Sequence, residues 1–85
     1  PRAIYFLQTG AFGNVADAEE EKARLPLLGF EARISSVQEG TTMLHKVRTG
    51  PYKSMDELNT DRARLTQNGV ETMLVKIALP QEEKR

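Results

Sequence analysis

The 85-residue chain contains no cysteine, a single histidine and no excess of charge of either sign. Without cysteine it can form neither a disulfide framework nor a thiolate zinc site. One histidine, His45, cannot build a His-based catalytic triad or a multi-histidine metal centre, so no cofactor is expected. The 12 basic and 12 acidic residues sum to zero, which disfavours a protein that tracks nucleic-acid phosphates or binds a membrane surface electrostatically.

Long apolar runs are missing too. None approaches the roughly 18 residues of a membrane-spanning helix, and no signal-peptide pattern opens the chain. The start at Pro1-Arg2 is expected of an excised domain. With 39% hydrophobic and 28% charged residues, the composition predicts one folded domain over 1–79 and a polar tail at 80–85. So short a chain buries about 60–65% of its unfolded surface, which favours an exposed binding face over a catalytic cleft.

An internal repeat with an offset of 40 residues runs through most of the chain. Residues 4–37 align with residues 44–77 without a gap, so that Thr9-Gly10 falls on Thr49-Gly50, Ala23-Arg24-Leu25 on Ala63-Arg64-Leu65, and Gly29 on Gly69. Identity between the halves is low, but the matched positions are glycines, helix caps and core leucines. The repeat therefore predicts one supersecondary unit that occurs twice.

Each half is predicted to form a strand, a helix and a second strand. Apolar and β-branched runs predict strands at Ile4–Thr9, Phe30–Val37 and Val70–Leu79. The third strand in chain order is predicted to end at Thr49–Tyr52. The cap Asn14 and the Ser54–Glu57 capping box predict helices over Val15–Leu25 and from Met55 to about Asn68. Their buried stripes are expected to include Val15, Ala18, Leu25, Met55, Leu58 and Leu65. Gln38–Thr42 is short enough to be a hairpin connection.

A β-α-β-β-α-β order predicts an α+β, ferredoxin-like (RNP-like) fold with a four-stranded antiparallel sheet. Right-handed crossovers place the first and third strands in the centre and both helices on one face. Strand alternation divides the side chains between the two faces. The helix-facing set is expected to be Tyr5, Leu7, Thr9, Ala32, Ile34, Val47, Thr49, Thr72 and Leu74, with His45 at its edge.

The other face of the sheet is left open, and there we expect the functional site. Its side chains combine apolar groups with an amide and cations: Phe6, Gln8, Arg33, Ser35, Leu44, Lys46, Arg48, Met73 and Val75, with Ile77 farther along. The cations make this face locally basic, with only Glu31 and Glu71 expected at its margins. An exposed face of this composition indicates a ligand surface.

Such a patch suits a neutral polymer of sugars, because ring C–H faces pack on Phe6, Leu44 or Met73 while hydroxyl and acetamide groups hydrogen-bond to Gln8. Two other functions stay open. A single-stranded RNA could stack on the same face, although zero net charge and the absence of an RNP1 aromatic pair oppose this. The face could also bind a protein partner or a second copy. The carboxylates lie on helix faces and in the tail, so a catalytic acid–base pair is not expected.

Two segments resemble a known family. Tyr5–Phe12, followed by Ala18, Leu25 and Gly29-Phe30, resembles the first repeat of SPOR (sporulation-related) domains. Lys46–Tyr52, with Leu65 and Gly69, resembles the second repeat, where an aromatic-Arg-Val-x-x-Gly-Pro-Phe pattern is usual. The resemblance covers about residues 4–77. Within the family, Leu27–Ala32 looks most like the C-terminal domain of FtsN-type cell-division proteins.

This resemblance implies a non-catalytic domain that binds peptidoglycan in the periplasm, with a preference for septal glycan strands from which amidases have removed the stem peptides. It also implies a parent with an N-terminal membrane anchor and a periplasmic linker. Divisome proteins are expected as partners through that parent, and the domain itself is expected to be a monomer. Family glycan contacts carry over to Gln8, and Met73 matches an apolar position of the fourth strand. Ala11 and Leu44 stand where serine and an aromatic residue are frequent, which removes one hydroxyl contact and weakens ring stacking.

Overall fold

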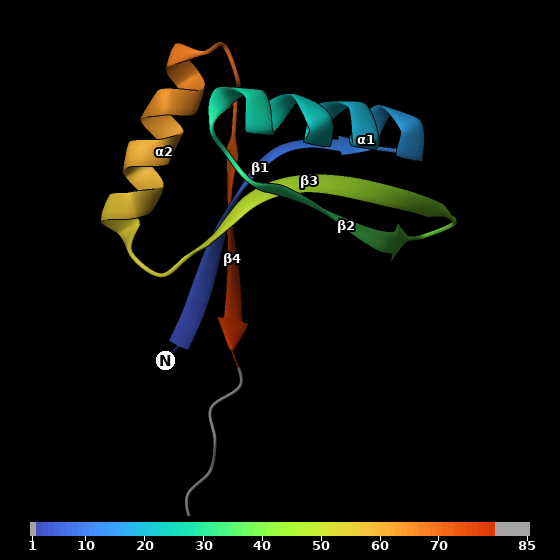
Figure 1. The fold of residues 1–85 in the computed structure, drawn as a ribbon. Coiled ribbons are helices and arrows are strands. Elements are labelled where there is room, and N and C mark those ends of the chain that lie inside the picture. The colour runs from blue at the N-terminus through green and yellow to red at the C-terminus, as the bar shows by residue number, and fades with distance from the viewer. Residues whose placement is uncertain (1, 80–85) are drawn as a thin grey trace, which may run out of the picture.

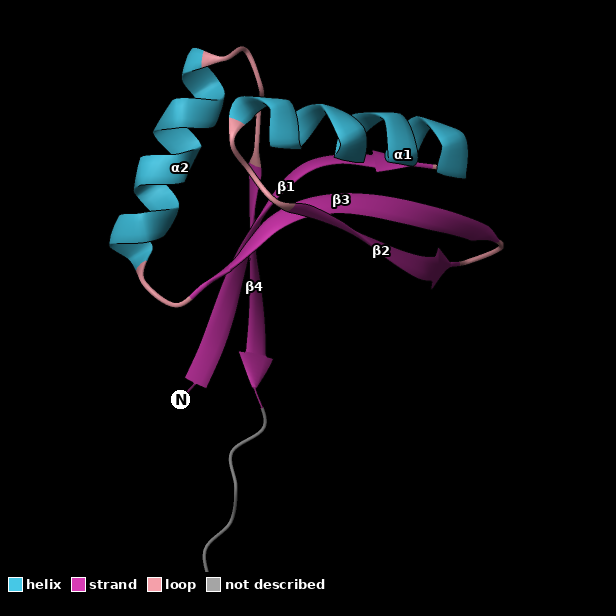
Figure 2. Ribbon diagram, viewed as in Figure 1, coloured by secondary structure: helices cyan, strands magenta, loops and turns pink. Residues whose placement is uncertain are grey.

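The structure is a computed structural model that describes residues 2–79. Its elements follow the predicted order: β1 (Arg2–Phe12), α1 (Val15–Arg24), the 3-10 turn η1 (Leu25–Leu28), β2 (Ala32–Glu39), β3 (Thr42–Tyr52), α2 (Met55–Gln67) and β4 (Met73–Leu79). The four strands form one antiparallel sheet in the order β2-β3-β1-β4, so the predicted central pair is confirmed (Figure 1). Both helices pack on the same side of this sheet (Figure 2). The predicted polar tail at 80–85 lies outside the described residues.

Both helices begin where the sequence predicts them to begin. The Asn14 side chain accepts a 2.7 Å hydrogen bond from the amide of Ala16, and the Ser54 hydroxyl accepts from the amides of Asp56 and Glu57. Each cap satisfies amides that a helix cannot pair internally. α1 ends at Arg24, one residue earlier than predicted, because Pro26 has no amide hydrogen for an α-helical bond and the chain tightens into η1.

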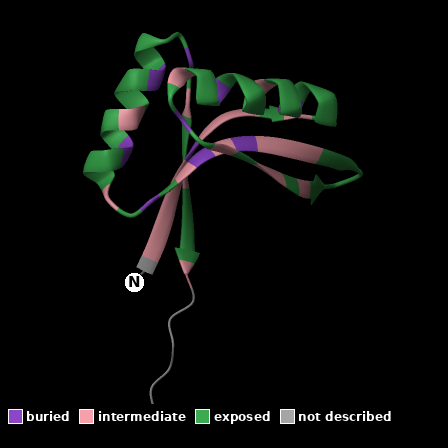
Figure 3. Cartoon of the chain, viewed as in Figure 1, coloured by how far each residue is buried: buried purple, intermediate pink, exposed green. Residues whose placement is uncertain are grey.

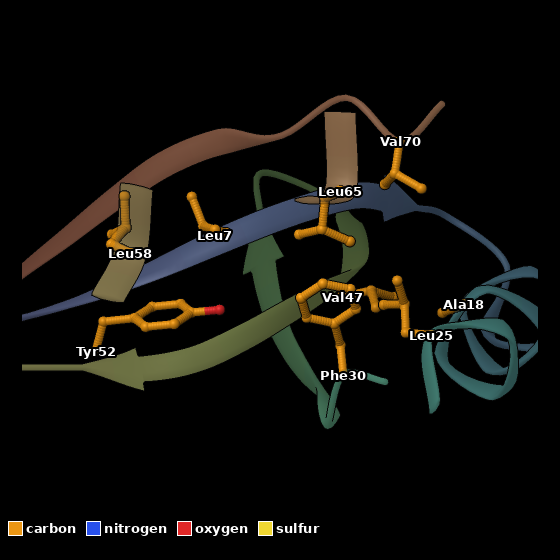
Figure 4. Packing of buried hydrophobic residues seen from close by; sticks show 9 residues of the cluster. All are labelled: Leu7, Ala18, Leu25, Phe30, Val47, Tyr52, Leu58, Leu65 and Val70. Carbon is orange, nitrogen blue, oxygen red and sulfur yellow. The ribbon is translucent and has the colours of Figure 1, made fainter. Parts of the chain in front are cut away.

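The core consists of equivalent positions from the two halves of the chain (Figure 4). Its buried hydrophobic residues include four pairs that are 40 positions apart: Leu7 with Val47, Ala18 with Leu58, Leu25 with Leu65, and Phe30 with Val70. The ninth, Tyr52, corresponds to Phe12, which packs against the same cluster. Burial is concentrated where the helices meet β1 and β3, as the purple segments in Figure 3 show. The two halves therefore build one core in common.

Two predicted burials are wrong, and one residue that faces the helices as predicted is exposed. Val15 and Met55 are 52% and 42% exposed, because each is the first residue of its helix and the buried stripe starts one turn later, at Ala18 and Leu58. Leu74 pairs with Leu7 and so faces the helices, yet it is 41% exposed. The reason is that α2 packs mainly on β1 and β3, which leaves the edge strand β4 uncovered.

A buried polar network ties β3 to α2. The Tyr52 hydroxyl donates a 2.7 Å hydrogen bond to Oδ2 of Asp61 and lies 3.0 Å from Oγ1 of Thr49. Burial raises the pKa of Tyr52 to about 12, since it disfavours the phenolate; the hydrogen bond to Asp61 and its charge act in the same direction, and the Thr49 hydroxyl opposes them. The network therefore holds Tyr52 in its neutral form.

Stability is expected to fall at alkaline pH through this group. Because the folded-state pKa of Tyr52 is raised above an unfolded value of about 10, its protonated form stabilises the fold below that pH, and the contribution is lost as pH rises through about 12. Urea unfolding of the wild type and of Tyr52→Phe, measured from neutral pH upward, checks this. The free energy of unfolding should fall more steeply above pH ~10 in the wild type; parallel curves would contradict the assignment.

Candidate functional site

Strand registers place all nine predicted site residues on the face opposite the helices. On β1 and β4, Phe6 pairs with Val75 and Gln8 with Met73. On β2 and β3, Arg33 pairs with Arg48 and Ser35 with Lys46, while Leu44 pairs with Val37. Residues directly opposite each other in an antiparallel sheet share a face. Since Leu7, Val47 and Thr49 are buried under the helices, the alternate residues form one surface, which we call the open face.

One row of side chains crosses the whole sheet on this face. It runs Arg33–Arg48–Gln8–Met73 from β2 through β3 and β1 to β4. With neighbouring strands about 4.8 Å apart, the row is about 14 Å long. Arg33 is exposed, Arg48 and Gln8 are half-buried, and Met73 is 61% exposed. The open face is therefore cationic on the β2 side and apolar on the β4 side.

The middle of the row is held by direct contacts. Nε of Arg48 donates a 3.3 Å hydrogen bond to Oε1 of Gln8, and the Arg48 guanidinium carbon lies 5.7 Å from the centroid of the Phe6 ring. A cation at this distance from an aromatic face is attracted to it. Because its carbonyl oxygen is used by Arg48, the Gln8 amide is oriented with its NH₂ group available to an acceptor on a ligand. Phe6, Gln8 and Arg48 thus form a preorganised cluster.

Lys46 differs from the two arginines because an acid neutralises it. Its ammonium lies 3.1 Å from Oε2 of Glu39, a residue of β2 that shares the open face. The expectation that only Glu31 and Glu71 lie at the margins of this face is therefore wrong. The sequence predicts Glu39 in the connection 38–42, whereas β2 continues through it and the hairpin loop is Gly40-Thr41 alone.

A bulge in β1 changes which residues reach the open face. Between the pairs Gln8–Arg48 and Gly10–Val47, β1 has one extra residue, Thr9, whose hydroxyl donates to the Val47 carbonyl at 3.5 Å. The bulge reverses the alternation beyond it. Ala11 therefore lies beside Lys46 on the open face, and Phe12 turns to the core.

Sequence reasoning missed two apolar residues of this face as well as Glu39. Val37 continues the alternation from Arg33 and Ser35, and that signal was sufficient to include it. Ala11 could not be placed without knowledge of the bulge. His45 lies where predicted, on the helix-facing side, with Nδ1 2.7 Å from Oγ of Ser36.

A hollow is found on the other side of the molecule. A cleft of about 420 Å³ on the helix side is lined by Phe12, Asp17, Glu20, Glu21 and Arg24. Residues 2–79 contain no group of three or more side chains placed to hold a metal ion. No helix within the same range is long and apolar enough to cross a membrane.

A sheet with one face under two helices and the other presenting a row of polar and apolar side chains defines a small α+β binding module. Residues 1–76 match the SPOR domain family. The chain belongs to this family, as its two repeats predicted.

Relatives with known names agree with the family. The chain is 39% identical over 72 residues to the endolytic peptidoglycan transglycosylase RlpA in two strains of Pseudomonas aeruginosa. That match covers 81% of this chain but 21% of RlpA, so the chain spans about a fifth of the length of these relatives. The likeness to FtsN-type proteins remains a prediction from the sequence.

Two solved structures share the fold. The crystal structure of the RlpA SPOR domain from Pseudomonas aeruginosa has a TM-score of 0.72 and 36% identity, over 85% of this chain and 96% of that one. The solution structure of the peptidoglycan binding domain of the B. subtilis cell wall lytic enzyme CwlC has a TM-score of 0.77 and 26% identity, over 92% and 94%. Both matches span nearly the entire solved domain.

Proposed function

We propose that this SPOR domain binds peptidoglycan through the open face of its sheet, as a non-catalytic module. The observation that carries the proposal is the Arg33–Arg48–Gln8–Met73 row, which combines hydrogen-bonding and apolar groups on one uninterrupted surface. The peptidoglycan-binding domain of CwlC, with the same fold, supports the choice of ligand. The transglycosylase activity in the name of RlpA belongs to a protein of which this chain matches 21%, and we do not extend it to this domain.

The chemistry of the face suits glycan strands. Exposed Met73 and half-buried Phe6 and Leu44 offer apolar contact to sugar C–H faces, while the Gln8 NH₂ group can donate to acetamide carbonyls. An open sheet face of this kind takes an extended polymer more readily than a compact small molecule, which needs a concave pocket.

The finer proposal concerns where and to what the domain binds. We propose that it prefers glycan strands without stem peptides, as they occur at the division septum, and that it acts in the periplasm as a monomeric part of a membrane-anchored parent. Contacts with divisome proteins would be made by other parts of that parent protein. The SPOR resemblance supports the preference for bare septal strands, the periplasmic location and the anchored parent.

Co-sedimentation with purified sacculi tests the proposal. The domain should sediment with amidase-treated sacculi and considerably less with intact sacculi, because treatment exposes bare glycan. Chitin beads of equal mass serve as a control for general adhesion to polysaccharide. A domain that stays in the supernatant in every case refutes peptidoglycan binding, whereas equal sedimentation with treated and intact sacculi refutes only the preference for bare strands.

A further inference from the structure

The cationic end of the open face has two arginines at directly paired positions of neighbouring strands. Arg33 on β2 and Arg48 on β3 are register partners. Their Cβ atoms are expected to lie about 5 Å apart, and like charges at such positions repel each other. An anion that binds both guanidinium groups removes this repulsion.

No acid of the protein supplies that anion in the range 2–79. The ion pairs found there join Arg24 with Glu21, Lys46 with Glu39, and Arg64 with Asp61. Arg48 bonds instead to the neutral amide of Gln8, through Nε alone. Within the same residues its two terminal nitrogens have no hydrogen-bond acceptor, and Arg33 has none at any nitrogen. The charge of Lys46, two residues from Arg48 on β3, is compensated by Glu39. Arg33 and Arg48 differ from it because neither has such an acidic partner among these residues.

Arg48 is also fixed in place. Its contact with Gln8 and its position over the Phe6 ring restrain the guanidinium before any ligand arrives. A restrained guanidinium loses little side-chain entropy when it binds, and its planar fork matches the two oxygens of a carboxylate. The pair therefore has the features of a carboxylate site.

We infer that Arg33 and Arg48 form a subsite for the free lactyl carboxylate of muramic acid, an inference that rests on the proposed function. In a peptide-bearing strand the lactyl carbonyl belongs to a neutral amide. Hydrolysis of that amide, with release of the peptide amine, leaves a carboxylate on the sugar. The pair thus recognises the one group whose charge changes when a strand is stripped, and ring faces pack toward Met73 at the other end of the row.

The test compares two forms of one oligosaccharide. A peptide-free GlcNAc–MurNAc oligosaccharide is used as the free acid and as its lactyl methyl ester, and affinities are measured by calorimetry at low salt. The wild type should bind the acid roughly tenfold more tightly or better, the usual effect of charge-assisted hydrogen bonds. Arg33→Gln should bring the acid-to-ester ratio close to one. Lys46→Gln, which removes a cation that Glu39 already compensates, should leave most of the ratio intact.

The outcomes separate this subsite from the function on which it rests. If the wild type binds acid and ester equally, or if Arg33→Gln keeps the wild-type ratio, the carboxylate subsite is wrong while glycan binding stands. If neither form binds and a single-stranded RNA of equal length does, both proposals fall. An acid-to-ester affinity ratio that declines as the salt concentration is raised supports an ionic contact between the carboxylate and the arginines, because salt screens exposed charges.

Discussion

The double variant Gln8→Ala, Met73→Ala is expected to lose co-sedimentation with amidase-treated sacculi. The two residues are partners across β1 and β4, so the variant removes an amide donor and an exposed apolar side chain from adjacent positions of the open face. Met73 is 61% exposed and lies outside the core. Stability should therefore change little, as for most surface substitutions, and the melting temperature should stay within a few degrees of the wild type.

A matched control has the same chemical changes on the opposite side of the molecule. Met55 and Gln67 are exposed residues at the two ends of α2, and the variant Met55→Ala, Gln67→Ala should sediment like the wild type. Normal sedimentation of the Gln8, Met73 variant, at an unchanged melting temperature, would show that the open face is not the binding site. Loss of sedimentation in both variants would point to a general effect on the fold.

The fold could be predicted because each half contains local signals that agree with one another. Asn14 and Ser54 begin helices, and Gly29 ends the first helical segment with a positive φ of 95°. The first strand is longer than predicted, because Gly10 was interpreted as its end, whereas β1 continues past the bulge at Thr9 to Phe12. The fourth strand is shorter, since β4 begins at Met73 and the prediction began at Val70. Gly50 lies within β3, which ends at Tyr52 as predicted, and its φ of 121° is a backbone conformation that other residues rarely reach. Whether a glycine ends a strand or distorts it depends on the strand beside it, which local sequence does not specify.

The assignment of residues to the two faces of the sheet is correct where alternation is unbroken. Phe6 and Gln8 precede the bulge at Thr9, so a period of two places them correctly. The pairing of Glu39 with Lys46 could not be predicted, because it depends on the register of the β2–β3 hairpin. A two-residue loop sets that register, and the sequence was compatible with a longer one. To predict which charges pair on a sheet one must know the strand register, whereas to predict which residues share a face one needs only the alternation of side chains along each strand.

The helices' uneven coverage of the sheet could not be predicted either. Alternation shows which face Leu74 occupies, and that assignment holds. It does not show whether a helix lies above that position. α2 packs mainly on the central strands, so burial follows from the placement of whole elements, a tertiary property that no window of sequence contains.

Leu25→Ala and Leu65→Ala should each destabilise the domain by about 2–5 kcal/mol, the range measured for buried leucines. The two residues occupy equivalent positions in the repeats, are fully buried and belong to one core cluster. Because the halves share this core, either cavity should lower the stability of the whole domain, with a single unfolding transition. For a chain of this size the melting temperature should fall by roughly 10–30 °C.

Leu27→Ala is the control for this prediction, since it deletes the same atoms two positions away from Leu25 at a side chain that is 85% exposed. Its melting temperature should stay near that of the wild type, because no cavity forms at an exposed site. Thermal unfolding followed by far-UV circular dichroism compares the three variants. Two separate transitions in Leu25→Ala or Leu65→Ala would mean that the repeats unfold independently, and a Leu65→Ala variant as stable as Leu27→Ala would contradict a core that both repeats build.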